Sequence, residues 1–181
     1  MDKATRKQMF QLLESYLKEL GIESKYVSGA GAPQLGDTLL TMVPVMGAGD
    51  LSALMEIALV DMGDNLYYLQ FYSTLIMDCA DAQDEFYKCL NDMNFFTPVG
   101  SFGIFRQQRQ LFHKYSIIVG DGETAENVAE RALTALHAVT KVHAWRMPLI
   151  SGIYTGELNY ETVAAKGLFT AGVEELNSAL A

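Results

Sequence analysis

The three histidines have the widest choice of chemistry in this chain, because imidazole can bind a metal or transfer a proton near neutral pH. They are His113, His137 and His143. Two ligands on a helix share a face when they are three or four residues apart, whereas His137 and His143 are six apart. No carboxylate stands at a ligand interval from either. We therefore expect no metal site, and we interpret His113 as a partly buried packing residue rather than a general base.

A run of acidic residues offers a second candidate for cation binding. It contains Asp78, Asp81, Asp84 and Glu85. Calcium loops place ligands at alternate positions around a central glycine and end on a bidentate glutamate, and this run lacks that pattern. Carboxylates in the first turn of a helix favour the helix dipole. The acids therefore predict a helix that begins near Asp81.

The remaining reactive residue types lack the neighbours that would make a site. The segment GAGAPQLG, residues 29–36, carries no lysine followed by serine or threonine, as a phosphate loop requires, and no full dinucleotide fingerprint. No serine stands in an elbow motif, the sequence certifies no basic side chain within reach of Cys79 or Cys89, and neither has another Cys or a His at metal-binding spacing. We expect buried free thiols, no catalytic residue, no cofactor and no enzymatic activity.

Composition narrows the class of partner. The 181 residues suit one domain, and 22 Asp and Glu against 13 Lys and Arg give a formal charge of −9. Such a charge repels nucleic acid phosphates and suits a basic segment of a partner protein. No apolar run approaches the roughly 20 residues needed to span a bilayer, and the N-terminus lacks the pattern of a secretory signal. We therefore expect a cytoplasmic protein that binds neither nucleic acid nor membrane.

Hydrophobic spacing sets out the first half of the fold. Apolar residues at helical intervals predict a helix over 3–20, closed by Gly21. A short strand over 22–27 is one interpretation of the next segment. Three strands separated by turn residues then form an antiparallel meander. They cover 38–46, 51–61 and 66–76, and Pro44 indicates an edge position for the first of them.

The second half alternates helices with a hairpin. After the helix that begins near Asp81, the strands 99–106 and 111–119 flank a polar turn, and a helix over 124–145 follows. Residues 159–181 predict one or two short helices. The fold class is α+β, an antiparallel sheet of a three-stranded meander plus a hairpin with helices packed on it, in the order α-β-β-β-α-β-β-α. We expect one domain over 1–147, with 148–181 as a C-terminal extension packed on it.

The strands of the meander are apolar on both faces, which one layer of helices does not explain. In a sheet with one solvated face, alternate positions are polar. In the third meander strand Tyr67, Leu69 and Phe71 share one face, while Tyr68 and Tyr72 share the other. Three alternatives could cover the second face: the C-terminal segment or the glycine-rich loop, a second copy of the chain, or an exchangeable partner. Flexible methionine side chains would help such a surface adapt to a partner. The residues expected to form a partner-binding or dimer surface are Met42, Met46, Met55, Tyr68 and Tyr72.

The order of elements, together with LNDMNFFTPVGSFGIF over residues 90–105, resembles the YbjN-type family, whose members are named as sensory transduction regulators and share the fold of type III secretion chaperones. The resemblance covers about residues 3–145. It implies a compact α+β protein that often forms homodimers, with no known catalytic residue and no required cofactor. Chaperones of this fold bind extended partner segments through apolar patches. The matching residues are Asn91, Asn94, Gly100, Phe102, Phe112 and Tyr115.

These observations predict a non-enzymatic protein-binding protein, regulatory or chaperone-like, that acts through an apolar sheet face as a homodimer. The expected partners are a second copy and an unidentified protein segment. The alternative is a small-molecule-binding protein or an enzyme with a pocket between helix and sheet, for which convergent His, Asp and Arg side chains are the sign to look for.

Overall fold

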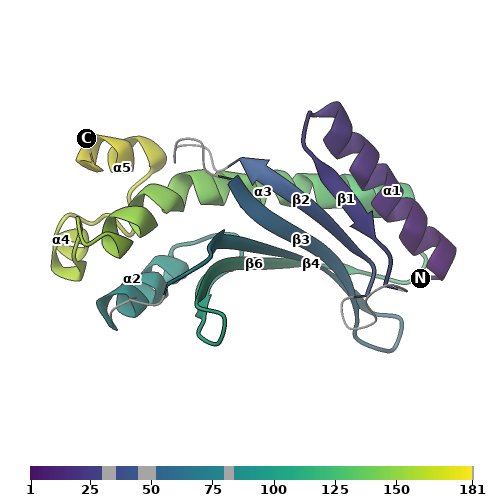
Figure 1. Ribbon diagram of the computed structural model, residues 1–181, viewed down its shortest axis with the longest axis horizontal. Coiled ribbons are helices and arrows are strands. Elements are labelled where there is room, and N and C mark those ends of the chain that lie inside the picture. The colour runs from purple at the N-terminus through teal and green to yellow at the C-terminus, as the bar shows by residue number, and fades with distance from the viewer. Residues whose placement is uncertain (30–35, 45–51, 80–83, 181) are drawn as a thin grey trace.

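A six-stranded antiparallel sheet organises the structure, a computed structural model that describes residues 1–29, 36–44, 52–79 and 84–180. The strand order is β1-β2-β3-β4-β6-β5 (Figure 1). The predicted α+β class and antiparallel sheet are confirmed, and the short strand β1 adds the sixth member. The strands are β1 (Ser24–Val27), β2 (Thr38–Pro44), β3 (Ser52–Asp61), β4 (Tyr67–Ile76), β5 (Ser101–Phe105) and β6 (Gln110–Val119).

The alternation of side chains along β3 and β4 defines the buried face of the sheet. Met55, Ile57, Leu69 and Phe71 have no exposed surface, while the residues between them are half-buried. Successive side chains of a strand point to opposite faces, so this two-residue period places the core on one side.

Two helices cover that face, α1 (Lys3–Glu19) and α3 (Ala125–Tyr154). Asp2 caps α1 by accepting the Thr5 N–H at 2.8 Å, and Thr124 caps α3 in the same way through the Asn127 N–H. Small residues on the buried side of α3 allow the two helices to approach closely. The buried residues of α1 are Met9, Phe10, Leu13 and Leu17, and the buried alanines of α3 are Ala125, Ala129, Ala132 and Ala135.

Helix α3 is longer than its sequence indicates. The expected end at Trp145 is wrong, because the helix passes through Pro148 and ends at Tyr154. The expected domain boundary between residues 147 and 148 thus falls inside it. An interior proline costs a helix about 3 kcal/mol. Burial of Leu149, Ile150 and Ile153 against the rest of the protein offsets that cost.

The remaining helices gather at one end of the molecule. They are α2 (Asp84–Phe95), α4 (Tyr160–Ala165) and α5 (Val173–Leu180). Figure 1 shows all three near the C-terminal end of α3 and away from the middle of the sheet. The expected start of α2 near Asp81 lies outside the described residues. No helix within the described ranges is long and apolar enough to cross a membrane.

The position of β2 corrects one expectation. Pro44 indicated an edge strand, yet β2 lies between β1 and β3. The pairing with β1 covers only Thr38 to Thr41, so Pro44 stands at the end of β2, beyond the ladder with β1. Its missing N–H therefore removes no bond from that ladder.

Candidate functional site

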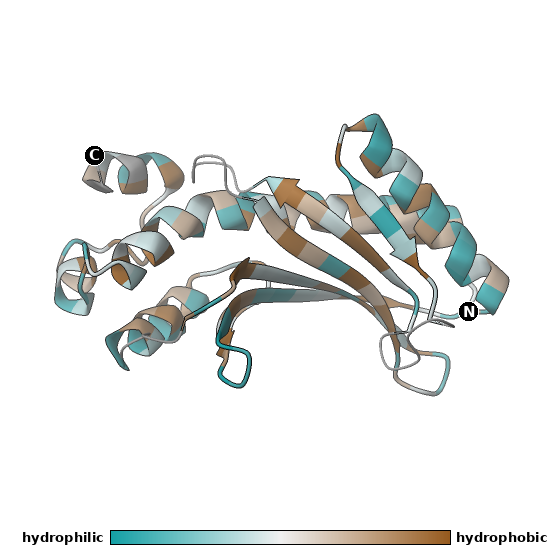
Figure 2. Cartoon of the chain, viewed as in Figure 1, coloured by the Kyte–Doolittle hydropathy of each residue, from teal (hydrophilic) through white to brown (hydrophobic). Residues whose placement is uncertain are grey.

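The second face of the sheet, here called the open face, is covered by no helix in the part of the chain that the structure describes. Its central side chains come from β3, β4 and β6, and they are half-buried or exposed apart from Thr74. Hydrophobic residues predominate along β3 (Figure 2), so apolar side chains point to both faces of the sheet. The open face consists of Leu40, Met42, Leu54, Glu56, Ala58, Val60, Tyr68, Gln70, Tyr72, Thr74, Phe112, Lys114, Ser116 and Ile118.

Three of the five residues predicted for a binding surface lie on the open face. Met42 is 45% exposed, and Tyr68 and Tyr72 are half-buried. The assignment of Met55 to this surface is wrong, because its side chain is 0% exposed and points into the core on the other face. Met46 falls outside the described residues.

An aromatic pair forms the middle of the open face. The rings of Tyr72 and Phe112 stack with centroids 5.2 Å apart. Phe112 also lies over Gly103 of β5, where an added Cβ would stand 2.7 Å from the ring. Beside this pair the surface is hollowed to about 570 Å³, between the sheet and the β5–β6 hairpin. Phe105 and Met77, 40% and 67% exposed, line the hollow and extend its apolar surface.

Two charges flank the aromatic pair. Tyr72 pairs in register with Glu56 on β3 and with Lys114 on β6, so the three side chains form one row across the sheet. Partial burial, with the Glu56 carboxylate as a second cause, raises the pKa of Tyr72. The phenol therefore stays neutral at physiological pH, and the row presents one negative, one neutral and one positive side chain.

Side chains from two helices form hydrogen bonds with backbone groups of both edge strands, β1 and β5. On β5, the Asn94 amide donates to the Phe102 carbonyl and accepts the Phe102 N–H, each at 2.8 Å. On β1, the Glu14 carboxylate accepts the Tyr26 N–H at 3.1 Å. Unpaired edge groups are the template on which a further strand adds. These two contacts remove such groups, so Asn94, one of the residues that carry the resemblance, satisfies backbone groups of β5.

A buried histidine pair lies on the opposite face, between β6 and α3. His113 and His143 are both 0% exposed, and Nδ1 of His113 lies 3.2 Å from Nε2 of His143. The His113 Nε2 is 2.9 Å from the Val99 carbonyl, which only accepts, so that nitrogen carries the proton. His113 Nδ1 is then an acceptor and His143 Nε2 the donor, which leaves His143 Nδ1 without a hydrogen-bond partner.

Burial keeps both imidazoles neutral. It lowers the pKa of His113 to about 4, although the Val99 carbonyl acts in the other direction. It lowers the pKa of His143 to about 3, with the charge of a protonated His113 as the second cause.

Ser73 pairs in register with His113 and is also fully buried. Serine and histidine could act as nucleophile and base, but substrate has no access to side chains with no exposed surface.

Gly100, from the segment over residues 90–105 that carries the resemblance, lies against the histidine pair, where a larger residue would not fit. Gly100 has φ +72°, and an added Cβ would stand 2.6 Å from both His113 Nε2 and the Lys114 carbonyl oxygen. Gly100→Ala should therefore lower the free energy of unfolding by about 2 to 4 kcal/mol, from backbone strain and overpacking together. Urea unfolding followed by circular dichroism measures this change.

Gly63→Ala is the matched control, because Gly63 has φ +81° but nothing within 4 Å of an added Cβ. It should cost only the backbone term of about 1 kcal/mol. Equal losses in the two variants would mean that the contact with His113 is unimportant.

An apolar pocket of about 460 Å³ lies between the helices and the sheet, where the alternative function would need one. Among the described residues that line it, His137 is the one titratable side chain, and none of the others is an acid or an arginine. The residues around it are Leu20, Ile22, Val43, Pro44, Leu133, Thr134, Leu136 and Thr140.

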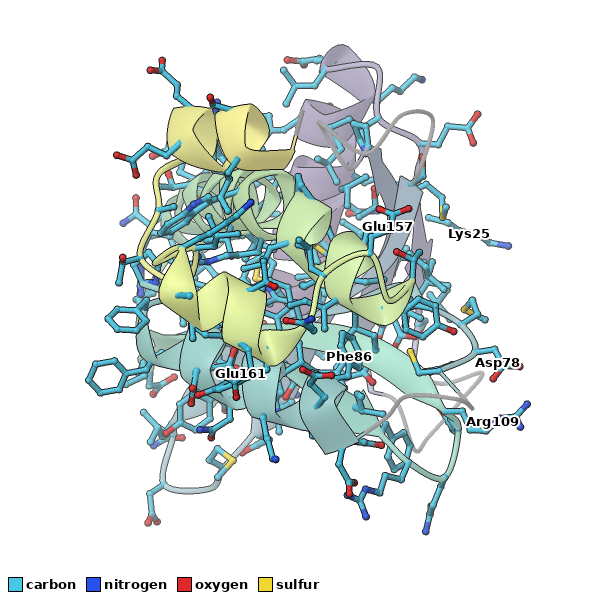
Figure 3. The ribbon with its side chains drawn as sticks, turned by 90° about the vertical axis from the view of Figure 1, so that its left-hand side faces the viewer. Lys25, Asp78, Phe86, Arg109, Glu157 and Glu161 are labelled. Atoms are coloured by element: carbon cyan, nitrogen blue, oxygen red, sulfur yellow. The ribbon has the colours of Figure 1, made fainter. Side chains whose placement is uncertain are left out.

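The acids and thiols have structural roles. Asp78, which follows β4, forms an exposed ion pair at 2.9 Å with Arg109 in the turn between β5 and β6 (Figure 3). Asp84 and Glu85 stand in the first turn of α2, as the dipole argument predicts. Within the described ranges no group of three ligating side chains could hold a metal ion. Both cysteines are buried and free, as expected, and burial raises the pKa of Cys89 to about 11.

Fold and surface together define an α+β protein with helices on one face of an antiparallel sheet and an open second face. No protein-family model matches the chain, and no curated protein sequence matches it. Among solved structures the chain is similar to that of YbjN, described as "a putative transcription regulator from E. coli". The two share 16% identity over 75% of this chain and 89% of YbjN, with a TM-score of 0.42. The relation is one of fold only.

Proposed function

We propose that this chain is a non-enzymatic binding protein, regulatory or chaperone-like, that acts in the cytoplasm through the open face and forms a homodimer. The observation that carries the proposal is a helix-free sheet face bearing Leu54, Tyr68, Tyr72 and Phe112. Burial of apolar surface yields roughly 25 cal/mol per Å². Neighbouring apolar side chains exposed on one face are typical of a surface that binds another protein.

The C-terminal segment does not compete for this face. Helix α5 packs against α3, and α4 packs against α2. The Tyr160 hydroxyl donates to the Asp92 carboxylate of α2 at 2.7 Å, and the Trp145 indole donates to the Ala171 carbonyl at 2.8 Å. These contacts hold the segment at the end of α3. Residues 30–35 of the glycine-rich loop, the other covering expected from within the chain, lie outside the described residues. A second copy or a protein partner is the covering that we propose.

Docking on the face is favoured over addition of a strand at an edge. The Asn94 and Glu14 contacts occupy backbone groups on the two edge strands. A partner that binds by side-chain contact needs neither edge. The formal charge of −9 argues against nucleic acid as that partner.

Purified protein should therefore migrate as a dimer. Light scattering after size exclusion at micromolar concentration should give about twice the chain mass of 20.0 kDa. The physical reason is that the apolar residues of the open face leave water on association. A mass that stays at that of one chain across the micromolar range would refute the homodimer.

A further inference from the structure

The open face is built from rows that run across three strands. Residues in register on β3, β4 and β6 form each row, and the central member always comes from β4. Every central side chain is neutral. The four rows are Leu54–Thr74–Phe112, Glu56–Tyr72–Lys114, Ala58–Gln70–Ser116 and Val60–Tyr68–Ile118.

We infer that a second copy of the chain docks on the open face about a two-fold axis that runs along β4, an inference that rests on the proposed homodimer. A two-fold axis between two facing sheets lies in the plane between them. An axis along β4 leaves β4 opposite β4 and brings β3 of one copy opposite β6 of the other. In such an isologous interface each contact occurs twice.

The rows are complementary to themselves under this operation. Apolar residues oppose apolar residues, small residues oppose small residues, and the charged pair opposes its own complement. No like charges meet on the axis, because the β4 side chains there are Tyr68, Gln70, Tyr72 and Thr74. The opposed pairs are Leu54 with Phe112, Glu56 with Lys114, Ala58 with Ser116, and Val60 with Ile118.

The charged row favours an axis along β4 over one that crosses the strands at Tyr72. If the axis ran across the strands through Tyr72, Glu56 would oppose Glu56 and Lys114 would oppose Lys114. Like charges placed opposite each other at an interface disfavour it strongly. When the axis runs along β4, the same row forms two contacts between the copies, each between Glu56 of one copy and Lys114 of the other. One contact lies on each side of the paired Tyr72 rings.

The dimensions and the surroundings suit this arrangement. Facing sheets pack about 10 Å apart, a gap that a glutamate and a lysine from opposite sheets span together. Neither Glu56 nor Lys114 forms an ion pair with another described residue of its own chain. The hollow beside Phe112 receives the apolar side chain of Leu54 from the second copy.

Charge reversal tests the inference. Glu56→Lys opposes lysine to lysine at both symmetric positions, and Lys114→Glu opposes two acids. Each single variant should weaken the dimer at least about tenfold, measured as Kd by sedimentation equilibrium. The double variant E56K/K114E restores opposite charges, and its Kd should return to within about threefold of the wild-type value.

Lys141→Glu supplies the matched control, since Lys141 is exposed on α3, behind the sheet, and its substitution makes the same change in net charge as Lys114→Glu. Its Kd should equal that of the wild type. A wild-type dimer that neither single variant weakens would overturn this docking while leaving the homodimer intact, as would a double variant no tighter than the singles. A wild-type monomer would overturn both.

Discussion

Replacing Arg146 by methionine should lower the free energy of unfolding by about 2 to 4 kcal/mol, because it leaves one buried and one partly buried carbonyl oxygen without a donor. Arg146 is 0% exposed, and its Nη atoms donate to the carbonyls of Phe169 at 3.0 Å and Phe96 at 2.9 Å. Burial lowers the pKa of its guanidinium to about 10, so it is still charged at neutral pH. Methionine fills much of the volume but donates no hydrogen bond.

The residue links three segments that lie far apart in the sequence. It stands on α3, Phe96 follows α2, and Phe169 precedes α5. Its guanidinium also lies 3.6 Å from the ring centroid of Trp145, the one tryptophan of the chain. The emission of that tryptophan should therefore shift to longer wavelength in Arg146→Met as water reaches the ring. This signal reports the local loosening, and urea unfolding reports the free energy.

Arg106→Met separates the effect of burial from the loss of an arginine. Arg106 is exposed, and its guanidinium lies 4.9 Å from the ring centroid of Tyr87. An exposed cation–π contact is worth about 0.5 to 1 kcal/mol, so this variant should lose no more than that. If Arg146→Met were as stable as Arg106→Met, the two carbonyl contacts would have no net effect on stability.

The sheet could be predicted from the sequence because its signal is local. The two-residue period of Leu69, Phe71 and their neighbours fixes which face of β4 is buried, and glycines and polar turns separate the strands. Met55 shows how residue type and position can point to different faces. It shares the period of Ile57 and Leu59, which indicates the core face, whereas a flexible methionine side chain by itself favours an adaptable binding surface.

Contacts between distant segments could not be predicted in this way. His113 and His143 are 30 residues apart, and only the placement of β6 beneath α3 brings them together. The period of the neighbouring apolar residues places each histidine on the buried side of its own element, His113 with Leu111 and His143 with Val139 and Met147, but it does not show that the two rings meet. The same limit applies to the length of helix α3. Pro148 indicates that the helix ends before it, but burial of Leu149 and Ile150 stabilises the helix beyond the proline.

The buried histidine pair should make the protein sensitive to mild acid. In the folded state the two pKa values lie at about 4 and about 3, against an ordinary value of 6.5. Between pH 6.5 and those values the unfolded chain binds protons that the folded chain does not, so stability falls as the pH falls. The slope is about 1.4 kcal/mol per pH unit for each histidine. From pH 7.5 to pH 5 the pair should therefore lose about 4 kcal/mol of stability.

His143→Gln should reduce this loss by about half, because one of the two titrating groups is gone. Its stability at pH 7.5 can fall without affecting the test, since the slope against pH is the quantity compared. Urea unfolding at intervals from pH 7.5 to pH 5 measures it, in a window that stays above the titration of the carboxylates.

His137→Gln is the control, because His137 is exposed on the same helix and the change of residue type is identical. It should keep the wild-type slope. A His143→Gln slope equal to that of the wild type would place the acid sensitivity elsewhere. The expected difference between these variants follows from burial: His143 Nδ1 is buried and has no hydrogen-bond partner among the described residues, so its protonation places a charged donor in the core.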